Sequence, residues 1–158
     1  MAHYGAPLVG QNLVAGRVPP ELAKVVVDGL VLSRRDASVA RALPVLLWRR
    51  RADLDMAKLR RLVASKRRER ALGFFLDLTA RLSGDRRLRN AAAALRPTRP
   101  PTETRFFTRR ESPLARMVAK ARTPPVARAW GYRMNMPMDS FRSLFEKFNA
   151  LNGPAQSA

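Results

Sequence analysis

A chain of 158 residues with a net charge of +19 and no cysteine excludes several classes of protein. Without cysteine there are no disulfides and no thiolate metal ligands, and a hydrophobic fraction of 46% argues against a wholly disordered chain. A positive charge of this size attracts polyanions, so nucleic acid is the first expected partner. An anionic membrane surface or an acidic protein comes next.

The N-terminal part is expected to consist of an arm and a helix. Residues 1–18 are glycine-rich and nearly uncharged, and we expect them to be disordered or bound to a partner. Pro19 and Pro20 suit the first turn of a helix, which the apolar spacing predicts for residues 21–33. The three consecutive valines in this segment leave a strand as the alternative.

A second helix is predicted for residues 36–51, with Asp36 or Ser38 as its N-terminal cap. Pro44 lies inside it and is expected to kink or divide the helix, because proline has no backbone N–H to donate. Trp48 and three consecutive arginines end the segment.

Two amphipathic helices are predicted between Asp53 and Ser83, separated by the charged run KRRER at residues 66–70. Gly84 is expected to end the second of them. Asp85 can cap a further helix over residues 85–96, whose alanine run has high helix propensity.

The helical pattern fails at residues 96–108, which contain three prolines and are predicted to form a linker. Phe106 and Phe107 within it either anchor the linker to the core or form a contact surface. After it, short helices are predicted for residues 111–122 and from Pro125.

A last helix is predicted for residues 140–153, capped by Asp139 or Ser140 and ended by Gly153. Its apolar stripe is expected to close the core, with docking on a partner as the alternative. The stripe consists of Phe141, Leu144, Phe145, Phe148 and Leu151.

The predicted fold is therefore mainly α, a compact bundle of about six to seven short helices. Its expected parts are an arm (1–18), a basic helical core (19–95), a Pro-rich linker (96–108), a smaller C-terminal helical segment (109–153) and a tail (154–158). No apolar run reaches the length of a membrane span, and the N-terminus lacks the features of a signal peptide. We expect a cytoplasmic protein.

Catalytic and metal-binding side chains are scarce. His3 is the single histidine, and no glycine-rich phosphate loop is present, so we expect neither an enzyme nor a cofactor. Asp53 and Asp55 resemble the acidic pair with which nucleotidyltransferases hold magnesium, which leaves such an enzyme as a less favoured alternative. Capping of a helix explains the same two carboxylates.

Residues 54–84 resemble the helical region of abortive-infection type antitoxins and related bacterial defence regulators. The resemblance rests on a helix, the junction Arg70-Ala71-Leu72-Gly73-Phe74 and a second helix. It implies a bacterial antitoxin or adaptor that docks on an acidic partner protein. The winged-helix DNA-binding part of such antitoxins is not recognisable in residues 1–52, and no functional residue is carried over.

The basic residues are concentrated in the middle of the chain. Residues 34–99 contain 19 basic and six acidic side chains, whereas residues 1–33 are neutral. Arginine outnumbers lysine, and its planar fork suits phosphate oxygens. We predict that folding brings these arginines onto one face that binds RNA or DNA, in a non-catalytic protein acting within a larger assembly. The candidate nucleic-acid-binding residues are Arg34, Arg35, Arg49, Arg50, Arg51, Arg60, Arg61, Lys66, Arg67, Arg68, Arg70, Arg86, Arg87 and Arg89.

Five aromatic residues are further candidates, because unpaired bases stack on aromatic rings. For each of them, packing in the core is the favoured interpretation. They are Trp48, Phe106, Phe107, Trp130 and Tyr132.

Overall fold

A computed structural model describes residues 21–150 except residue 66. The expected arm, Lys66, Leu151 and the stop at Gly153 lie outside these residues. In the described part the chain forms eight helices and two short strands, so the prediction of a mainly α, multi-helix fold is confirmed. The elements are α1 (Leu22–Leu32), α2 (Ala37–Arg49), α3 (Met56–Ser65), α4 (Glu69–Ser83), α5 (Arg86–Ala93), β1 (Thr104–Arg105), α6 (Pro113–Arg122), α7 (Pro125–Ala129), β2 (Tyr132–Arg133) and α8 (Met138–Ala150).

Short polar side chains fix where several helices begin, because each accepts a hydrogen bond from an otherwise unpaired backbone N–H of the first turn. The expected caps of α2 and α5 are confirmed, and Asp55 has the capping role at α3. The bonds are Ser38 N–H to Asp36 (2.8 Å), Lys58 N–H to Asp55 (2.9 Å), Leu88 N–H to Asp85 (2.9 Å) and Ala115 N–H to Ser112 (3.1 Å).

A division of the second helix and the expected cap of the last helix are both wrong. The second helix is not divided at Pro44, since α2 continues through this buried residue to Arg49. The last helix begins at Met138, so Asp139 and Ser140 lie in its first turn rather than at its cap.

The three valines of residues 25–27 form a helix and not a strand, because α1 buries them against neighbouring helices.

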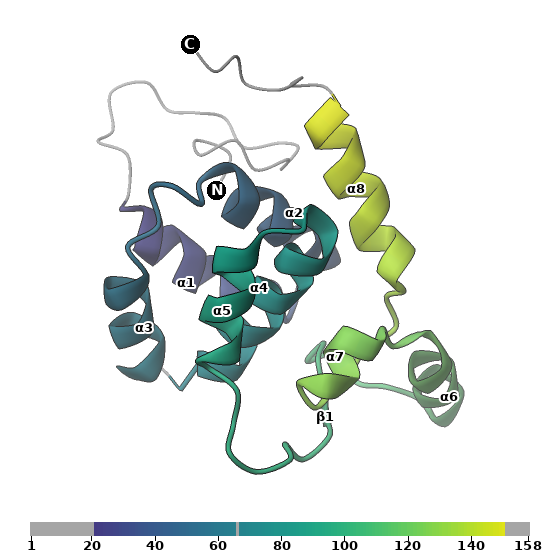
Figure 1. Cartoon of the computed structure of the whole chain (residues 1–158). Helices are drawn as coiled ribbons and strands as arrows, with labels where there is room; N and C mark the ends of the chain where they lie inside the picture. Colours follow the sequence, from purple (N-terminus) through teal and green to yellow (C-terminus); the bar gives the residue numbers. More distant parts are fainter. Residues whose placement is uncertain (1–20, 66, 151–158) are drawn as a thin grey trace, which may run out of the picture.

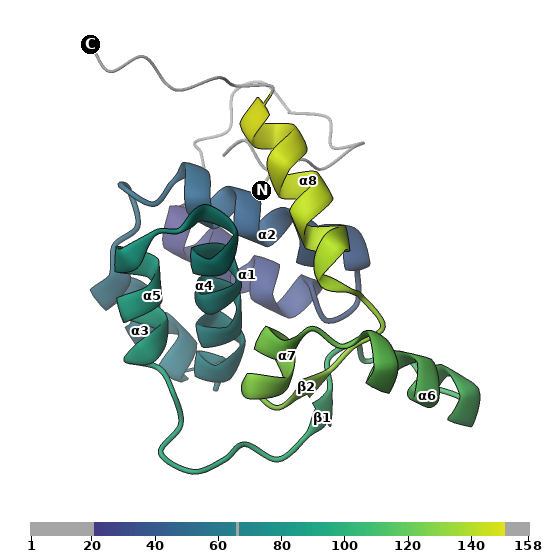
Figure 2. The same ribbon diagram turned by 45° about the vertical axis from the view of Figure 1, so that its right-hand side comes forward.

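The helices surround α4, in which every residue from Ala71 to Ala80 is buried. Helices α2 and α5 pack along it, α1 packs on α2 and α3, and α8 lies over α2 (Figures 1 and 2). Phe141 and Phe145 of α8 are buried, and the ring of Phe145 lies 6.3 Å from that of Trp48. The stripe on α8 therefore closes the core along α2, as expected.

The segment of residues 96–108 is attached to the rest of the protein by two features, the strand β1 and the buried side chain of Phe106. β1 pairs with β2 in parallel, with Thr104 opposite Tyr132, which the sequence did not predict. Phe106 is fully buried, and its ring lies edge-on to those of Phe74 (5.6 Å) and Tyr132 (5.3 Å). Of the two alternatives for Phe106, anchoring is the one the structure supports.

Trp130 fits into a slot on α4 that a glycine makes possible. A Cβ at Gly73 would lie 2.2 Å from Cη2 of the indole, so only glycine leaves room for the ring. One helical turn later, Asp77 accepts a hydrogen bond of 2.9 Å from the indole N–H. Gly73 and Asp77 together fix the position of α7 and β2 against the core.

Helix α6 projects from the rest of the molecule (Figures 1 and 2). Ala119 is its only buried residue. None of the helices in the described part of the chain combines the length and apolar character needed to cross a membrane.

Candidate nucleic-acid interface

Arg34 joins the end of α1 to the residues that follow β1. Its guanidinium donates to the carbonyl oxygens of Arg105 (2.8 Å) and Phe106, and its own carbonyl accepts from the N–H of Thr108 (2.8 Å). Burial lowers the pKa of Arg34 from its ordinary value, and the neighbouring Arg68 and Arg70 lower it further. This candidate residue therefore has a structural role, whatever else it binds.

Arg70 performs a similar role at the start of α4. Its guanidinium donates to the Thr102 carbonyl (3.1 Å) and to the Thr104 hydroxyl, and lies 4.4 Å from the ring centre of Tyr132. Arg34 lies 5.5 Å from the same ring. Two cations next to one aromatic ring stabilise the attachment of β1 and β2 to the helical core.

A second group of candidates lies where α2 ends and α5 begins. The Arg51 guanidinium is 3.7 Å from the ring centre of Trp48 and 3.8 Å from the Asp85 carboxylate, and Arg50 pairs with Asp53 at 3.0 Å. These contacts bring two basic segments together that are far apart in the sequence. The group consists of Arg49, Arg50, Arg51, Arg86, Arg87 and Arg89.

The remaining candidates lie on α3 and at its end. Arg60 is half-buried on α3, and Arg61 is exposed. Arg67 adopts a left-handed conformation (φ 53°), while its N–H and that of Arg68 donate to the carbonyls of Ala64 and Val63. This is the Schellman arrangement in which glycine is usual. Lys66 lies outside the described residues.

The candidates are thus not gathered on a single face. Helix α3 lies on the far side of α4 and α5 from the two strands in both views (Figures 1 and 2). Arg34, Arg68 and Arg70 lie together near Tyr132, and Arg35 is next to them at the turn before α2. The arginines after β1 extend this last group.

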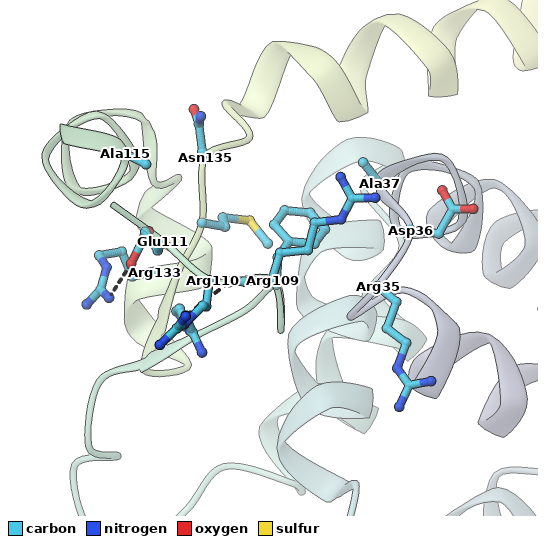
Figure 3. A pocket seen from close by; sticks show the side chains of 12 residues that line it. Arg35, Asp36, Ala37, Arg109, Arg110, Glu111, Ala115, Arg133 and Asn135 are labelled. Carbon is cyan, nitrogen blue, oxygen red and sulfur yellow. Dashed lines mark hydrogen bonds and ion pairs between the residues drawn. The ribbon is translucent and has the colours of Figure 1, made fainter. Parts of the chain in front are cut away.

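A cavity of about 630 Å³ lies beside that group, between the turn that joins α1 to α2 and the residues after β1 and β2. Figure 3 shows Arg35 and Asp36 on one side and residues 109–111 with Arg133 and Asn135 on the other. The lining residues are Arg35, Asp36, Ala37, Arg105, Phe107, Arg109, Arg110, Glu111, Ala115, Arg133, Met134 and Asn135.

Both carboxylates of the cavity are already hydrogen-bonded within the protein. Glu111 accepts from Arg133 (2.9 Å), and this bond raises the pKa of the Arg133 guanidinium, with Glu103 as a second partner. Asp36 accepts from the hydroxyl (2.6 Å) and N–H of Ser38, and these bonds lower the pKa of Asp36. Neither carboxylate has to pair with the other arginines of the cavity.

Four arginines of the cavity remain without a carboxylate partner in the part of the chain that the structure describes. Arg35, Arg109 and Arg110 are exposed and their side chains make no hydrogen bond there, while Arg105 donates to the Arg109 carbonyl at 3.0 Å. We call Arg35, Arg105, Arg109 and Arg110 the junction arginines. All four line the same cavity, with Arg35 and Arg110 on opposite sides of it (Figure 3).

Aromatic and apolar groups form the inner wall of the cavity. Phe107 is half-buried, with its ring at 90° to that of Phe106 and 5.1 Å from it, and Met134 is buried. Three other aromatic candidates are buried, which confirms the favoured interpretation that they pack in the core. They are Phe106, Trp130 and Tyr132. Phe107 and the half-buried Trp48 are the two with exposed ring surface.

The sequence interpretation missed Arg105, Arg109 and Arg110. It concentrated on residues 34–99, where the charge density is highest. The signal that was available is the pair Arg109-Arg110, which follows Phe106-Phe107 after one threonine and combines cations with aromatic rings in a way suited to nucleotides.

Asp53 and Asp55 are occupied with local contacts, to Arg50 and to the N–H of Lys58. Within residues 21–65 and 67–150, no three His, Cys, Asp or Glu residues are placed to hold a metal ion. No protein-family model, curated protein or solved structure matches this chain.

Proposed function

We propose that this protein binds nucleic acid without catalysing a reaction, as one component of a larger assembly, and that the junction arginines are its main phosphate contacts. The observation that carries the proposal is the exposure of Arg35, Arg109 and Arg110 with no carboxylate partner among the described residues, beside an aromatic wall. Arginine side chains left unpaired at one cavity repel each other, and a polyanion relieves that repulsion.

Several features of the chain support a polymeric ligand over a single small anion. The net charge is +19, and further exposed arginines lie on α5 and α6. A phosphate chain that occupies the cavity would pass over more basic surface on either side. Each neutralised phosphate releases condensed counterions, so affinity should fall steeply with salt.

Binding to labelled duplex and single-stranded DNA and RNA, measured between about 50 and 200 mM salt, tests this proposal. We expect log affinity to fall linearly with log salt. Replacing Arg35, Arg109 and Arg110 by Gln should lower affinity at least tenfold and reduce the slope by about two to three, since each phosphate contact contributes about 0.7 to 0.9.

A matched control removes the same three charges elsewhere. Arg86, Arg87 and Arg89 lie exposed on α5, away from the cavity, and their replacement by Gln should reduce affinity less than the junction variant does. Equal losses in both variants would mean that net charge alone drives binding. An absence of binding at low salt would contradict the proposal as a whole.

A second candidate function is docking on an acidic partner protein, and helix α6 is the observation that favours it. Leu114 and Met117 are each 68% exposed and Val118 is 36% exposed, at the spacing of one helix face. Arg116 and Lys120 lie on the same helix and are exposed. This combination is complementary to an amphipathic helix with acidic residues beside its apolar stripe.

The surroundings of α6 and the sequence resemblance also support this candidate. A cavity of about 520 Å³ lies between Met117 and Lys120 on one side and Arg128 on the other, and can receive a partner side chain. The similarity of residues 54–84 to antitoxins, which act by docking on another protein, points the same way.

Replacing Leu114 and Met117 by Ser tests the docking surface. A stoichiometric acidic protein that co-purifies from the native host should be lost from this variant. The control is Leu32→Ser, because Leu32 is 50% exposed but lies on α1. Retention of the partner by the α6 variant, or a change only in self-association in analytical ultracentrifugation, would contradict docking of an acidic partner.

A further inference from the structure

We propose that the cavity beside the junction arginines holds one unpaired nucleotide of a single strand, with its base on Phe107 and its phosphates at Arg109, Arg110 and Arg35. This inference rests on the proposed nucleic-acid binding and specifies its substrate class. It specifies which kind of nucleic acid is bound. An experiment can therefore contradict this inference while nucleic-acid binding still stands.

The size of the cavity fits one nucleotide. Its volume of about 630 Å³ lies within the range of small-molecule sites and is too small for a double helix. Chain segments distant in sequence line it, since Arg35 lies before α2 while Arg110 and Asn135 follow β1 and β2. A ligand here enters a depression and does not simply lie along a flat face (Figure 3).

The chemistry of the walls matches the two halves of a nucleotide. The base is flat and apolar on its faces, and Phe107 and Met134 offer the apolar wall. The edge of a base carries donors and acceptors, and the Asn135 amide at the cavity offers both. The phosphate carries the negative charge, and the unpaired arginines line the same cavity.

The position of Phe107 selects for an unpaired base. Its ring is half-buried and packs edge-on against that of Phe106, at 90° and 5.1 Å. Bases in a duplex are covered on both faces by their neighbours and cannot stack on a recessed ring. A strand with unstacked bases can insert one.

The carboxylates of the cavity do not oppose this ligand strongly. Arg133 neutralises Glu111, whereas Asp36 stays ionised and accepts hydrogen bonds from the hydroxyl and N–H of Ser38. The cavity therefore keeps a net positive charge, from five arginines against two carboxylates.

The test compares Phe107→Ala with the unchanged protein on three probes: a ten-nucleotide single strand, the corresponding duplex and an all-abasic strand with the same phosphates. Loss of one stacking contact should reduce affinity for the single strand about tenfold. Affinity for the duplex and the abasic strand, and the salt slope for all probes, should stay unchanged.

Two further variants keep the result interpretable. Phe107→Trp should retain single-strand affinity, because it keeps a ring that can stack. Phe107→Leu keeps the apolar packing against Phe106 and should bind like Phe107→Ala, which separates stacking from structural damage. A free nucleoside monophosphate should compete only weakly.

The outcomes separate the two proposals. If no probe binds, the proposed function fails. If all three probes bind and Phe107→Ala weakens them equally or not at all, nucleic-acid binding stands and the nucleotide site is overturned. If a mononucleotide competes as well as the strand does, the cavity is a site for free nucleotides, and the assignment to a strand is overturned.

Discussion

Gly73→Ala is expected to destabilise the protein by about 2 kcal/mol or more, although alanine is the better helix former by about 1 kcal/mol. The added Cβ would lie 2.2 Å from Cη2 and 2.3 Å from Cζ3 of Trp130. The indole cannot move aside easily, because its N–H is bonded to Asp77 on the same face of α4. Urea denaturation of both proteins measures the difference in the free energy of unfolding.

A double-mutant cycle identifies the contact responsible. In a Trp130→Phe background the ring is smaller, and the cost of Gly73→Ala should shrink. Gly84→Ala serves as the matched control, because no atom lies within 4 Å of its added Cβ and its cost arises from a left-handed backbone at φ 77°. That cost, about 1 kcal/mol, should be the same in both backgrounds. An equal cost of Gly73→Ala in both would exclude the indole as its cause.

Asp77→Ala is expected to cost about 3 kcal/mol, the range found when one partner of a buried charged network is removed. Asp77 is only 6% exposed and accepts from Trp130 (2.9 Å), Arg96 (3.0 Å) and Arg81 (3.1 Å). Its removal leaves the indole N–H buried without an acceptor. Thermal and urea unfolding both measure this loss.

Variants of the partners separate the buried bond from the exposed ones. The Arg81 and Arg96 side chains are about half exposed (51% and 48%), so Arg81→Ala and Arg96→Ala should each cost less than about 1 kcal/mol. Asp77→Asn keeps an acceptor for the indole and should fall between these variants and Asp77→Ala. If Asp77→Ala cost no more than Arg81→Ala, the bond to Trp130 would contribute little.

The helices were predictable because their ends and their apolar faces are local features. Asp36, Asp55 and Asp85 lie just before apolar segments, and each forms the cap that its spacing implies. Gly84 ends α4 in the left-handed conformation expected of it. The alternative of a helix divided at Pro44 is wrong, since the loss of one backbone donor does not divide a helix whose neighbouring residues are all buried.

The attachment of the C-terminal part was not predictable, because it depends on contacts between residues far apart in the chain. Gly73 and Asp77 are visible as a pair one turn apart, yet the sequence does not name Trp130 as their partner. The strand pairing of Thr104 with Tyr132 covers only two residues per strand and leaves no periodic signal.

The candidate site, too, has a part that was predictable from the sequence and a part that depends on contacts between distant residues. The excess of arginine was evident, but Arg34 and Arg70 donate to backbone and side-chain oxygens inside the protein, which composition alone does not reveal. Arg35 and Arg110 lie at one cavity although most of the helical core separates them in sequence. A charge count finds the class of ligand, whereas the fold selects the arginines that remain available.

The packing of α8 on α2 has a consequence for the nascent chain, because α8 is synthesised long after α2. About 90 residues separate the end of α2 from the start of α8, and at ribosomal speeds their synthesis takes roughly 5 to 20 seconds. During that interval α8 does not yet cover the apolar face of α2 against which Phe141 and Phe145 later pack. Until α8 has been synthesised, the chain is therefore prone to aggregation through this face of α2, and termination ahead of Met138 makes that state permanent.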